Sequence, residues 1–186
     1  MRYFIGIDIG GTKISVSLGT AAGKILSRQV FPSADVRTTF GQIKAIVQTY
    51  LKRFDPRLKK TKGIGISCPG PLDLKKGVLI TAPNMPNWRN VPVKKIVAGD
   101  FSFPIAIDND ANCAALGEQT FGAGKKVEHL FYYTVSTGIG GGLIINGRIY
   151  HGATNDAGEI GHTVILPQGP RCNCGKRGCL EALASG

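Results

Sequence analysis

Acidic residues are scarce in this chain, and it contains no long apolar run. Asp and Glu number 12 against 23 Lys and Arg, so the formal net charge is +11. A membrane-spanning helix needs ~20 consecutive apolar residues, and the start, MRYFIGIDIGG, lacks the basic segment and long apolar core of a signal peptide. Cys68 and Cys113 lie in apolar contexts typical of buried free thiols. We therefore expect a cytoplasmic protein without a membrane partner.

The positive charge is concentrated in the first part of the sequence. Residues 1–100 hold 17 Lys and Arg against 5 Asp and Glu, whereas residues 101–186 hold 6 against 7. A basic field attracts nucleic acid and polyphosphate nucleotides alike. The basic residues are scattered, however, without a recognition helix or an aromatic-interleaved patch. This distribution favours a solvated surface over a nucleic-acid interface.

Strands and helices alternate in the hydrophobic pattern, which is typical of the α/β class. Strands are expected at residues 2–9, 13–18, 24–31, 63–67, 78–81, 105–107, 130–135 and 142–145. Helices are expected from Thr38 or Thr39 to Phe54, at 93–98 and at 111–121. The Gly122-Ala123-Gly124 segment is the clearest boundary, so we predict a first lobe at 1–121 and the start of a second at 122–186.

The most informative stretch is GHTVILPQGPRCNCGKRGCLE at residues 161–181. It gathers one imidazole and three thiols in a loop rich in Gly and Pro. Zn²⁺ prefers tetrahedral nitrogen and sulfur ligands, and a site with three Cys and one His is structural rather than catalytic. A disulfide is the alternative, although three cysteines do not pair evenly. The sequence therefore predicts a structural zinc site with the ligands His162, Cys172, Cys174 and Cys179.

Two glycine-rich turns are candidates for nucleotide binding. Residues 7–13 read IDIGGTK, and residues 136–142 read STGIGGG. Backbone N–H groups without neighbouring Cβ atoms can approach phosphate oxygens, and a carboxylate at a strand end can hold Mg²⁺. Either turn alone is more often a plain hairpin, but the pair favours a triphosphate clamped between two lobes. The candidates are Asp8, which would hold Mg²⁺, and Gly10, Gly11, Thr12, Lys13, Thr137, Gly138 and Gly140.

A polar segment, DNDAN at residues 108–112, follows the strand expected at 105–107. Ligands of open α/β sheets collect at the carboxyl ends of strands. A hydroxyl that accepts a phosphoryl group needs a carboxylate to take its proton. Asp110 is the candidate general base, and Asn109 could hold a neighbouring hydroxyl. The alternative is that Asp108 or Asp110 only caps the following helix.

Carboxylates also accompany the predicted zinc loop. Glu159 and Glu181 could accept hydrogen bonds from the hydroxyls of a neutral polyol, and zinc on one ring nitrogen of His162 would aim the other nitrogen outward. The alternative is that both glutamates are solvated loop residues.

These motifs together resemble the ROK family (repressors, open reading frames and sugar kinases) of the actin/hexokinase-like ATPase superfamily. The matching pieces, in family order, are DIGGTK at 8–13, PGPLD at 69–73, DNDAN at 108–112, STGIGGG at 136–142, GEIGH at 158–162 and CNCGKRGCLE at 172–181. The resemblance implies two ribonuclease-H-like lobes and phosphorylation of a hexose, glucose above all, or an N-acetylhexosamine by ATP with Mg²⁺. Homodimerisation is a further expectation.

The resemblance also implies roles for individual residues. Asp110 becomes the general base, and the set His162, Cys172, Cys174 and Cys179 becomes the structural zinc site. The expected sugar ligands are Asn109, Glu159, His162 and Glu181, with Gly70 and Asn84 lining the pocket.

Length is the departure from the family pattern. The sequence stops at Ala184-Ser185-Gly186, where a long helix is expected to begin, so we expect a truncated second lobe. A fragment of this kind could retain sugar or zinc binding without catalysis, unless a partner chain supplies the rest. A sugar-sensing regulator of the same family is a further alternative. Such regulators carry a helix-turn-helix ahead of the first lobe, whereas here the first strand starts next to Met1, which favours the kinase.

Overall fold

The computed structural model describes residues 1–57, 59–82, 85 and 87–186, and it divides into two compact units. The first unit comprises Met1–Asp110, and the second comprises Ala111–Gly186. Each unit pairs a β-sheet with helices, so the α/β class expected from the sequence is confirmed. None of the helices in the described part of the chain has both the length and the apolar character needed to cross a membrane.

A five-stranded sheet forms the centre of the first unit. Its strands, in spatial order β3-β2-β1-β4-β8, are β3 (Ile25–Pro32), β2 (Lys13–Thr20), β1 (Tyr3–Ile9), β4 (Thr61–Cys68) and β8 (Ile105–Asn109). β1 runs antiparallel to β2 and parallel to β4, and β4 runs parallel to β8. Three neighbouring strands therefore present their carboxyl ends at one edge of the sheet, where ligand sites of α/β proteins form.

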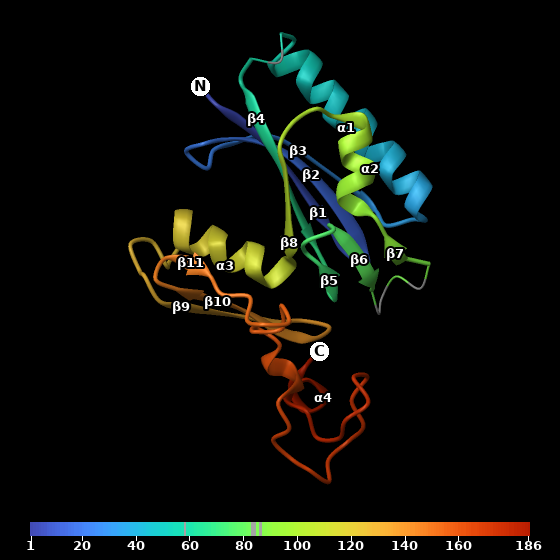
Figure 1. The fold of residues 1–186 in the computed structure, drawn as a ribbon, viewed down its shortest axis with the longest axis vertical. Helices are drawn as coiled ribbons and strands as arrows, with labels where there is room; N and C mark the ends of the chain where they lie inside the picture. Colours follow the sequence, from blue (N-terminus) through green and yellow to red (C-terminus); the bar gives the residue numbers. More distant parts are fainter. Residues whose placement is uncertain (58, 83–84, 86) are drawn as a thin grey trace. The chain divides into compact units, whose positions relative to one another are not determined.

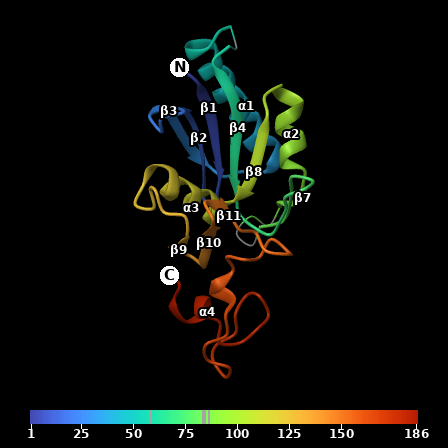
Figure 2. The ribbon, with the colours of Figure 1, turned by 60° about the vertical axis from the view of Figure 1, so that its left-hand side comes forward.

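Two helices, α1 (Val36–Phe54) and α2 (Val93–Asp100), cover one face of this sheet (Figures 1 and 2). Alternate residues of β1 point toward them, and Ile5, Ile7 and Ile9 are buried while Phe4 and Asp8 are exposed. This is the period of two that a strand buried on one face must show. The core is thus concentrated between the sheet and the two helices.

Asp residues define both ends of α1. The Asp35 side chain accepts the Thr38 N–H at 3.0 Å and caps the helix. The start expected at Thr38 or Thr39 was therefore wrong, because the cap lies further upstream. At the other end, the buried carboxylate of Asp55 accepts the N–H groups of Lys59, Lys60 and Thr61 at 2.7–3.0 Å. It thereby fixes the connection from α1 to β4.

A small antiparallel sheet lies between β4 and α2 in the chain. It consists of β5 (Leu72–Asp73), β6 (Val78–Thr81) and β7 (Arg89–Val91). Trp88 next to β7 is fully buried, packs on the ring of Phe40 of α1 and donates its indole N–H to the carbonyl oxygen of Ala34 at 3.0 Å. The short strands β5 and β7 were not expected from the sequence.

The second unit contains a three-stranded antiparallel sheet in the order β11-β10-β9. Its strands are β9 (Leu130–Val135), β10 (Ile139–Ile145) and β11 (Arg148–Ile149), with the 3₁₀ turn η1 (Ile160–His162) and α4 (Leu180–Ala184) following. Helix α3 (Asp110–Phe121) joins the two units in sequence. It approaches β10 so closely that a Cβ on Gly142 would lie 2.6 Å from the Cβ of Ala115.

The structure and the sequence interpretation assign helix α3 to different parts of the chain. By its contacts, the helix belongs to the second unit from Ala111 onward, whereas the sequence interpretation includes residues 111–121 in the first lobe. The division into lobes at 1–121 and 122–186 stays a prediction.

Candidate functional site

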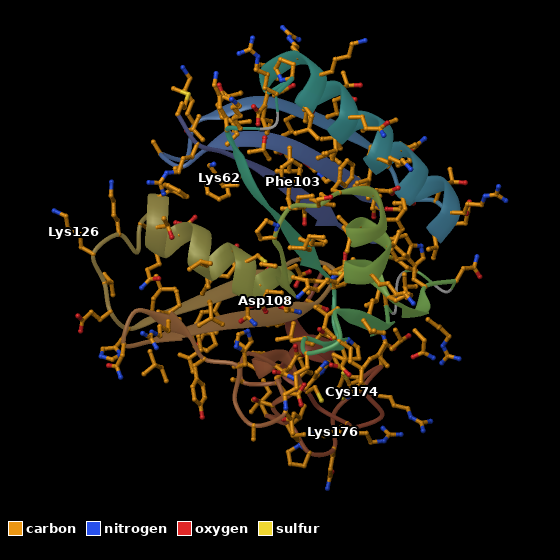
Figure 3. The ribbon with its side chains drawn as sticks, turned by 45° about the horizontal axis from the view of Figure 1, so that its top comes forward. Lys62, Phe103, Asp108, Lys126, Cys174 and Lys176 are labelled. Atoms are coloured by element: carbon orange, nitrogen blue, oxygen red, sulfur yellow. The ribbon has the colours of Figure 1, made fainter. Side chains whose placement is uncertain are left out.

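Three polar side chains lie in one row at the carboxyl edge of the first sheet. Asp8 of β1 is in register with Ser67 of β4, and Ser67 is in register with Asp108 of β8. The Ser67 hydroxyl donates to Oδ1 of Asp8 at 2.9 Å. Parallel pairing thus brings together two carboxylates that are a hundred residues apart in sequence. Figure 3 labels Asp108 at the end of its strand.

The first glycine turn connects β1 to β2 beside this row. The N–H of Gly10 donates to the carbonyl oxygen of Lys13 at 3.1 Å, which closes the hairpin around Gly11 and Thr12. The side chains of Thr12 and Lys13 are exposed. Gly11 also lines a hollow of about 290 Å³, together with Ser33, Ala34, Asp35, Met85, Asn87 and Trp88. The turn therefore leaves Gly11, Thr12 and Lys13 accessible to a ligand, while the N–H of Gly10 is used within the hairpin.

The DNDAN segment begins at the same edge. Asn109 ends β8 and Asp110 begins α3, where its side chain is exposed. Asp108 accepts the N–H of Asn109 at 2.8 Å. A Cβ added to Gly70 would lie 3.3 Å from the side-chain nitrogen of Asn109, so two of the residues expected to contact sugar are neighbours. Asn84, a third, lies outside the described residues.

The four predicted zinc ligands form a cluster in the second unit. Nδ1 or Nε2 of His162 and the sulfur atoms of Cys172, Cys174 and Cys179 all lie within 4.8 Å of one another. The Cys174 and Cys179 sulfurs are 3.6 Å apart, and the Cys172 sulfur is 3.7 Å from His162 Nδ1. With metal–sulfur bonds of about 2.3 Å, the edge of a coordination tetrahedron is about 3.8 Å. The residues therefore fit a tetrahedral zinc ion.

The loop that carries the cysteines is shaped by its own backbone hydrogen bonds. The Cys172 N–H donates to the carbonyl oxygen of Lys176 at 2.8 Å, closing a turn in which Gly175 has φ +92°. Gly178 also has a positive φ, +69°, a conformation that favours glycine. Cys172 and Cys179 are buried and Cys174 is exposed; Figure 3 labels Cys174 and Lys176 on this loop. All five cysteines of the chain are free thiols.

The environment divides the thiols by acidity. A hydrogen bond from the backbone N–H of Lys176 lowers the pKa of Cys174, whereas burial raises the pKa of Cys179 to about 11. A metal ligand must be a thiolate, so a bound cation would have to displace a proton from Cys179. Binding of a metal at this cluster would therefore release a proton and become weaker as the pH falls.

His162 turns its two ring nitrogens to different partners. Nδ1 faces the cysteines and lies 3.9 Å from the carboxylate of Glu181, and Nε2 lies 3.8 Å from the carboxylate of Glu159. Glu159 is exposed and Glu181 is half-buried. The structure therefore brings three of the predicted sugar ligands together, with Nε2 on the side of the ring away from the thiols.

The second glycine turn is shorter than expected. The turn comprises residues 136–138, where Ser136 N–H donates to the Gly138 carbonyl oxygen at 2.9 Å. Gly140 lies within strand β10, paired with Thr134 of β9. The expectation of one continuous turn over 136–142 was wrong, because the later glycines allow close packing of the strand. The roles of Thr137, Gly138 and Gly140 in nucleotide binding stay predictions.

Ser67 and Ser33 are site residues that the sequence reasoning missed. Ser67 holds Asp8, and the Ser33 hydroxyl donates to the carbonyl oxygen of Gly10 at 2.6 Å. Ser67 could have been found, because it ends a parallel strand as Asp8 does. Ser33 gives no comparable signal in the sequence, since its contact depends on how β3 leaves the sheet.

Comparison with known proteins gives the family. The profile of the ROK family matches residues 4–186. The chain belongs to the ROK family. It is 40% identical to a glucokinase of Thermotoga maritima, with 97% of this chain and 56% of the relative aligned. It is 38% identical to a xylose repressor of Caldicellulosiruptor bescii, with 97% of this chain and 46% of the relative aligned.

A solved structure agrees with this assignment. The chain matches a ROK family glucokinase from Streptomyces griseus in complex with glucose and AMPPNP, with a TM-score of 0.83 and 36% identity over 98% of this chain and 57% of that one. The fold is thus the α/β fold of ROK proteins, as the motifs implied. The chain spans about half the length of the curated relatives that it matches.

Proposed function

We propose that the chain belongs to a kinase that transfers the γ-phosphoryl group of ATP to a hexose hydroxyl. Glucose is the favoured substrate and an N-acetylhexosamine the alternative. The main observation in support is that the motifs around Asp8 and Asp110 meet at the carboxyl edge of the first sheet, where ligand sites of α/β proteins form. The row Asp8–Ser67–Asp108 lies at the carboxyl edge of the sheet, immediately before Asp110. The similarity to glucokinases, one of them solved with glucose and AMPPNP, supports the same reaction.

In the proposed mechanism Asp110 is the general base. The attacking sugar oxygen forms a bond to the γ-phosphorus, its proton passes to the carboxylate of Asp110, and the bond to the bridging oxygen breaks to release ADP. Asn109 and Gly70, with Asn84, would orient the acceptor sugar. Closure of the lobes predicted at 1–121 and 122–186 would exclude water from this transfer.

Hydrogen-bonding groups of the second unit would complete the sugar site. Glu159 and Glu181 would accept from sugar hydroxyls, and His162 would present Nε2 to the sugar. Zinc at His162, Cys172, Cys174 and Cys179 would supply the fixed charge that sets the tautomer of the ring. The distances of 3.6 Å and 3.7 Å within the cluster support this assignment.

The nucleotide would be held by the two glycine turns. Gly11, Thr12 and Lys13, with Gly10, and the turn of Thr137 and Gly138, with Gly140, would contact its phosphates. Asp8 would hold Mg²⁺, which neutralises charge on the transferred group when bound. A homodimer and a cytoplasmic location complete the proposal.

A coupled kinase assay across a panel of hexoses tests this function. The protein should be a chain extended to the length of its glucokinase relatives, loaded with zinc and supplied with ATP and Mg²⁺. Phosphorylation of glucose, or of one N-acetylhexosamine, is expected. No ADP release with any sugar, from a folded and zinc-loaded protein, would contradict the proposal.

A second candidate is a sugar-sensing transcriptional regulator, and the 38% identity to a xylose repressor favours it. The test is DNA binding by the extended protein at several salt concentrations. Sequence-selective, salt-sensitive binding that changes with sugar would support a regulator. The kinase proposal expects only weak, non-selective binding from the basic residues at 1–100.

A third candidate concerns residues 1–186 alone, which would bind sugar or zinc without turnover. Parallel titrations of ATP into this chain and into the extended chain decide it. Binding by the extended chain only is expected if the remaining half of the relatives' length completes the adenosine pocket.

A further inference from the structure

The carboxylate of Glu181 lies between two features that the proposed function treats separately. Its Oε2 accepts the backbone N–H of Ile139 at 2.9 Å, at the end of the glycine turn 136–138. Its Oε1 lies 3.9 Å from His162 Nδ1 and 3.9 Å from the Cys172 sulfur. One half-buried side chain thus contacts the turn with one oxygen and the zinc-ligand cluster with the other.

The glycine turn is built to admit this carboxylate. A Cβ added to Gly138 would lie 2.6 Å from Oε2 of Glu181, so any side chain there would push the carboxylate away from its present position. A second contact joins the same segments, because the N–H of Gly186 donates to the carbonyl oxygen of Ser136 at 2.7 Å. The segment after Cys179 therefore holds the turn at both of its ends, through Glu181 at Ile139 and through Gly186 at Ser136.

We propose that Glu181 couples the zinc cluster to the glycine turn 136–138, so that metal binding at the cysteines and phosphate binding at the turn strengthen each other. An ion at the cluster fixes Cys179 and hence the start of α4, which places the Glu181 carboxylate on the N–H of Ile139. With that hydrogen bond made, the turn keeps one conformation for a ligand. When no ion is bound at the cluster, we expect the hydrogen bond between Ile139 and Glu181 to break more often and the turn to become less ordered.

Binding linkage makes the coupling reciprocal. If zinc raises the affinity of the turn for a phosphate ligand by some factor, the ligand raises the affinity for zinc by the same factor. Couplings of this kind are typically about 5- to 150-fold. Glu181 would then be a positioning residue for the nucleotide, in addition to its proposed contact with sugar.

Amide hydrogen exchange tests the link without any nucleotide. In the extended wild-type protein, removal of zinc by a chelator should accelerate exchange at Ile139 while leaving the buried strand residue Ile144 protected. In Glu181→Ala, exchange at Ile139 should already be fast with zinc bound and should not change when zinc is removed. Equal acceleration in both proteins, or loss of protection at Ile144 as well, would overturn the proposal.

A matched control is available within the same unit. The Glu118 carboxylate accepts the backbone N–H of Ala123 at 2.9 Å, far from the cysteines in sequence. Glu118→Ala removes the same chemical group and the same kind of hydrogen bond, and it should keep the wild-type response of Ile139 to zinc. Gly138→Ala supplies the converse variant, since its methyl group displaces Glu181 without altering the carboxylate. It should reproduce the exchange behaviour of Glu181→Ala, and a wild-type response would contradict the link.

The second half of the experiment depends on the proposed function. The ligand is AMPPNP with Mg²⁺, titrated into zinc-loaded and zinc-stripped protein. Wild type and Glu118→Ala should bind it about 5- to 150-fold more tightly with zinc, and Glu181→Ala should bind it equally in both states. A zinc effect of the same size in Glu181→Ala would overturn the coupling. Absence of binding in every protein, with the exchange result intact, would contradict the nucleotide function and leave the link between cluster and turn in place.

Discussion

Replacing Gly161 by alanine should disturb the whole second-unit site through one methyl group. Gly161 is the buried centre of η1, between Glu159 and the proposed zinc ligand His162. A Cβ there would overlap the carbonyl oxygen of Ile139 and lie 2.8 Å from its carbonyl carbon. Carbon atoms rest at about 3.5–4.0 Å, so η1 must withdraw from β10 by about 0.7 Å or more. Because the obstacle is backbone, the turn has to move rather than a flexible side chain.

The expected magnitude follows from that displacement. Overpacking of this kind costs typically about 1–3 kcal/mol, which lowers the melting temperature of a chain of this size by about 2–12 °C. A shift of His162 by a similar distance should also weaken zinc binding. In an active, extended protein, a misplacement of about 1 Å at a site reduces turnover by about 10²-fold.

Thermal unfolding and metal analysis measure both effects on the same protein. Gly117→Ala is the matched control, because nothing lies within 4 Å of a Cβ at this position in α3. Alanine should stabilise that helix by up to about 1 kcal/mol and leave the zinc content unchanged. If Gly161→Ala has the same melting temperature and the same zinc content as Gly117→Ala, the close approach of η1 to β10 is refuted.

Two further predictions concern the metal and acid stability. Cys179→Ser should abolish stoichiometric zinc binding, whereas Cys113→Ser should retain one zinc per chain by metal analysis; equal zinc in both would remove the cysteine cluster as the site. At Asp55, burial alone would raise the pKa, but hydrogen bonds from the backbone at residues 59–61 outweigh it and hold the pKa below its usual value. The contribution of the Asp55 carboxylate to folding stability is therefore complete above its unfolded-state pKa of about 3.9. It is lost as the pH falls through the lower pKa of the folded state. Asp55→Asn should be about 1–3 kcal/mol less stable at pH 7, with the difference narrowing below about pH 4 in denaturant titrations; a gap independent of pH would contradict the assigned hydrogen bonds.

Local chemistry made most elements of the fold predictable. Strand β1 shows strict alternation, so Ile5, Ile7 and Ile9 could be assigned to the core, and β9 was predicted with its observed bounds. The grouping of His162 with three cysteines was also predictable from their closeness in sequence, and the structure brings the four side chains together. Their role as zinc ligands stays a prediction. Helix α3 was placed to within one residue by the apolar pattern after Asp110.

Long-range contacts account for what could not be predicted. The bond between Ser67 and Asp8 depends on the parallel register of β1 and β4, and the bond between Glu181 and Ile139 spans 42 residues. The run Gly140–Gly142 has the composition of a turn but forms strand, because β9 supplies an antiparallel partner and α3 requires a close approach. Sequence composition carries no information on such partners.

Turnover by Asp110→Asn in the extended, zinc-loaded protein tests the central proposal most directly. General-base catalysis contributes typically about 10²–10⁴-fold, and the amide keeps nearly the same shape as the carboxylate. Phosphoryl transfer from ATP to glucose should therefore fall by at least about 10²-fold, while the dissociation constant for glucose changes little. Undiminished turnover, with sugar bound as in the wild type, would remove Asp110 from the role and contradict the account.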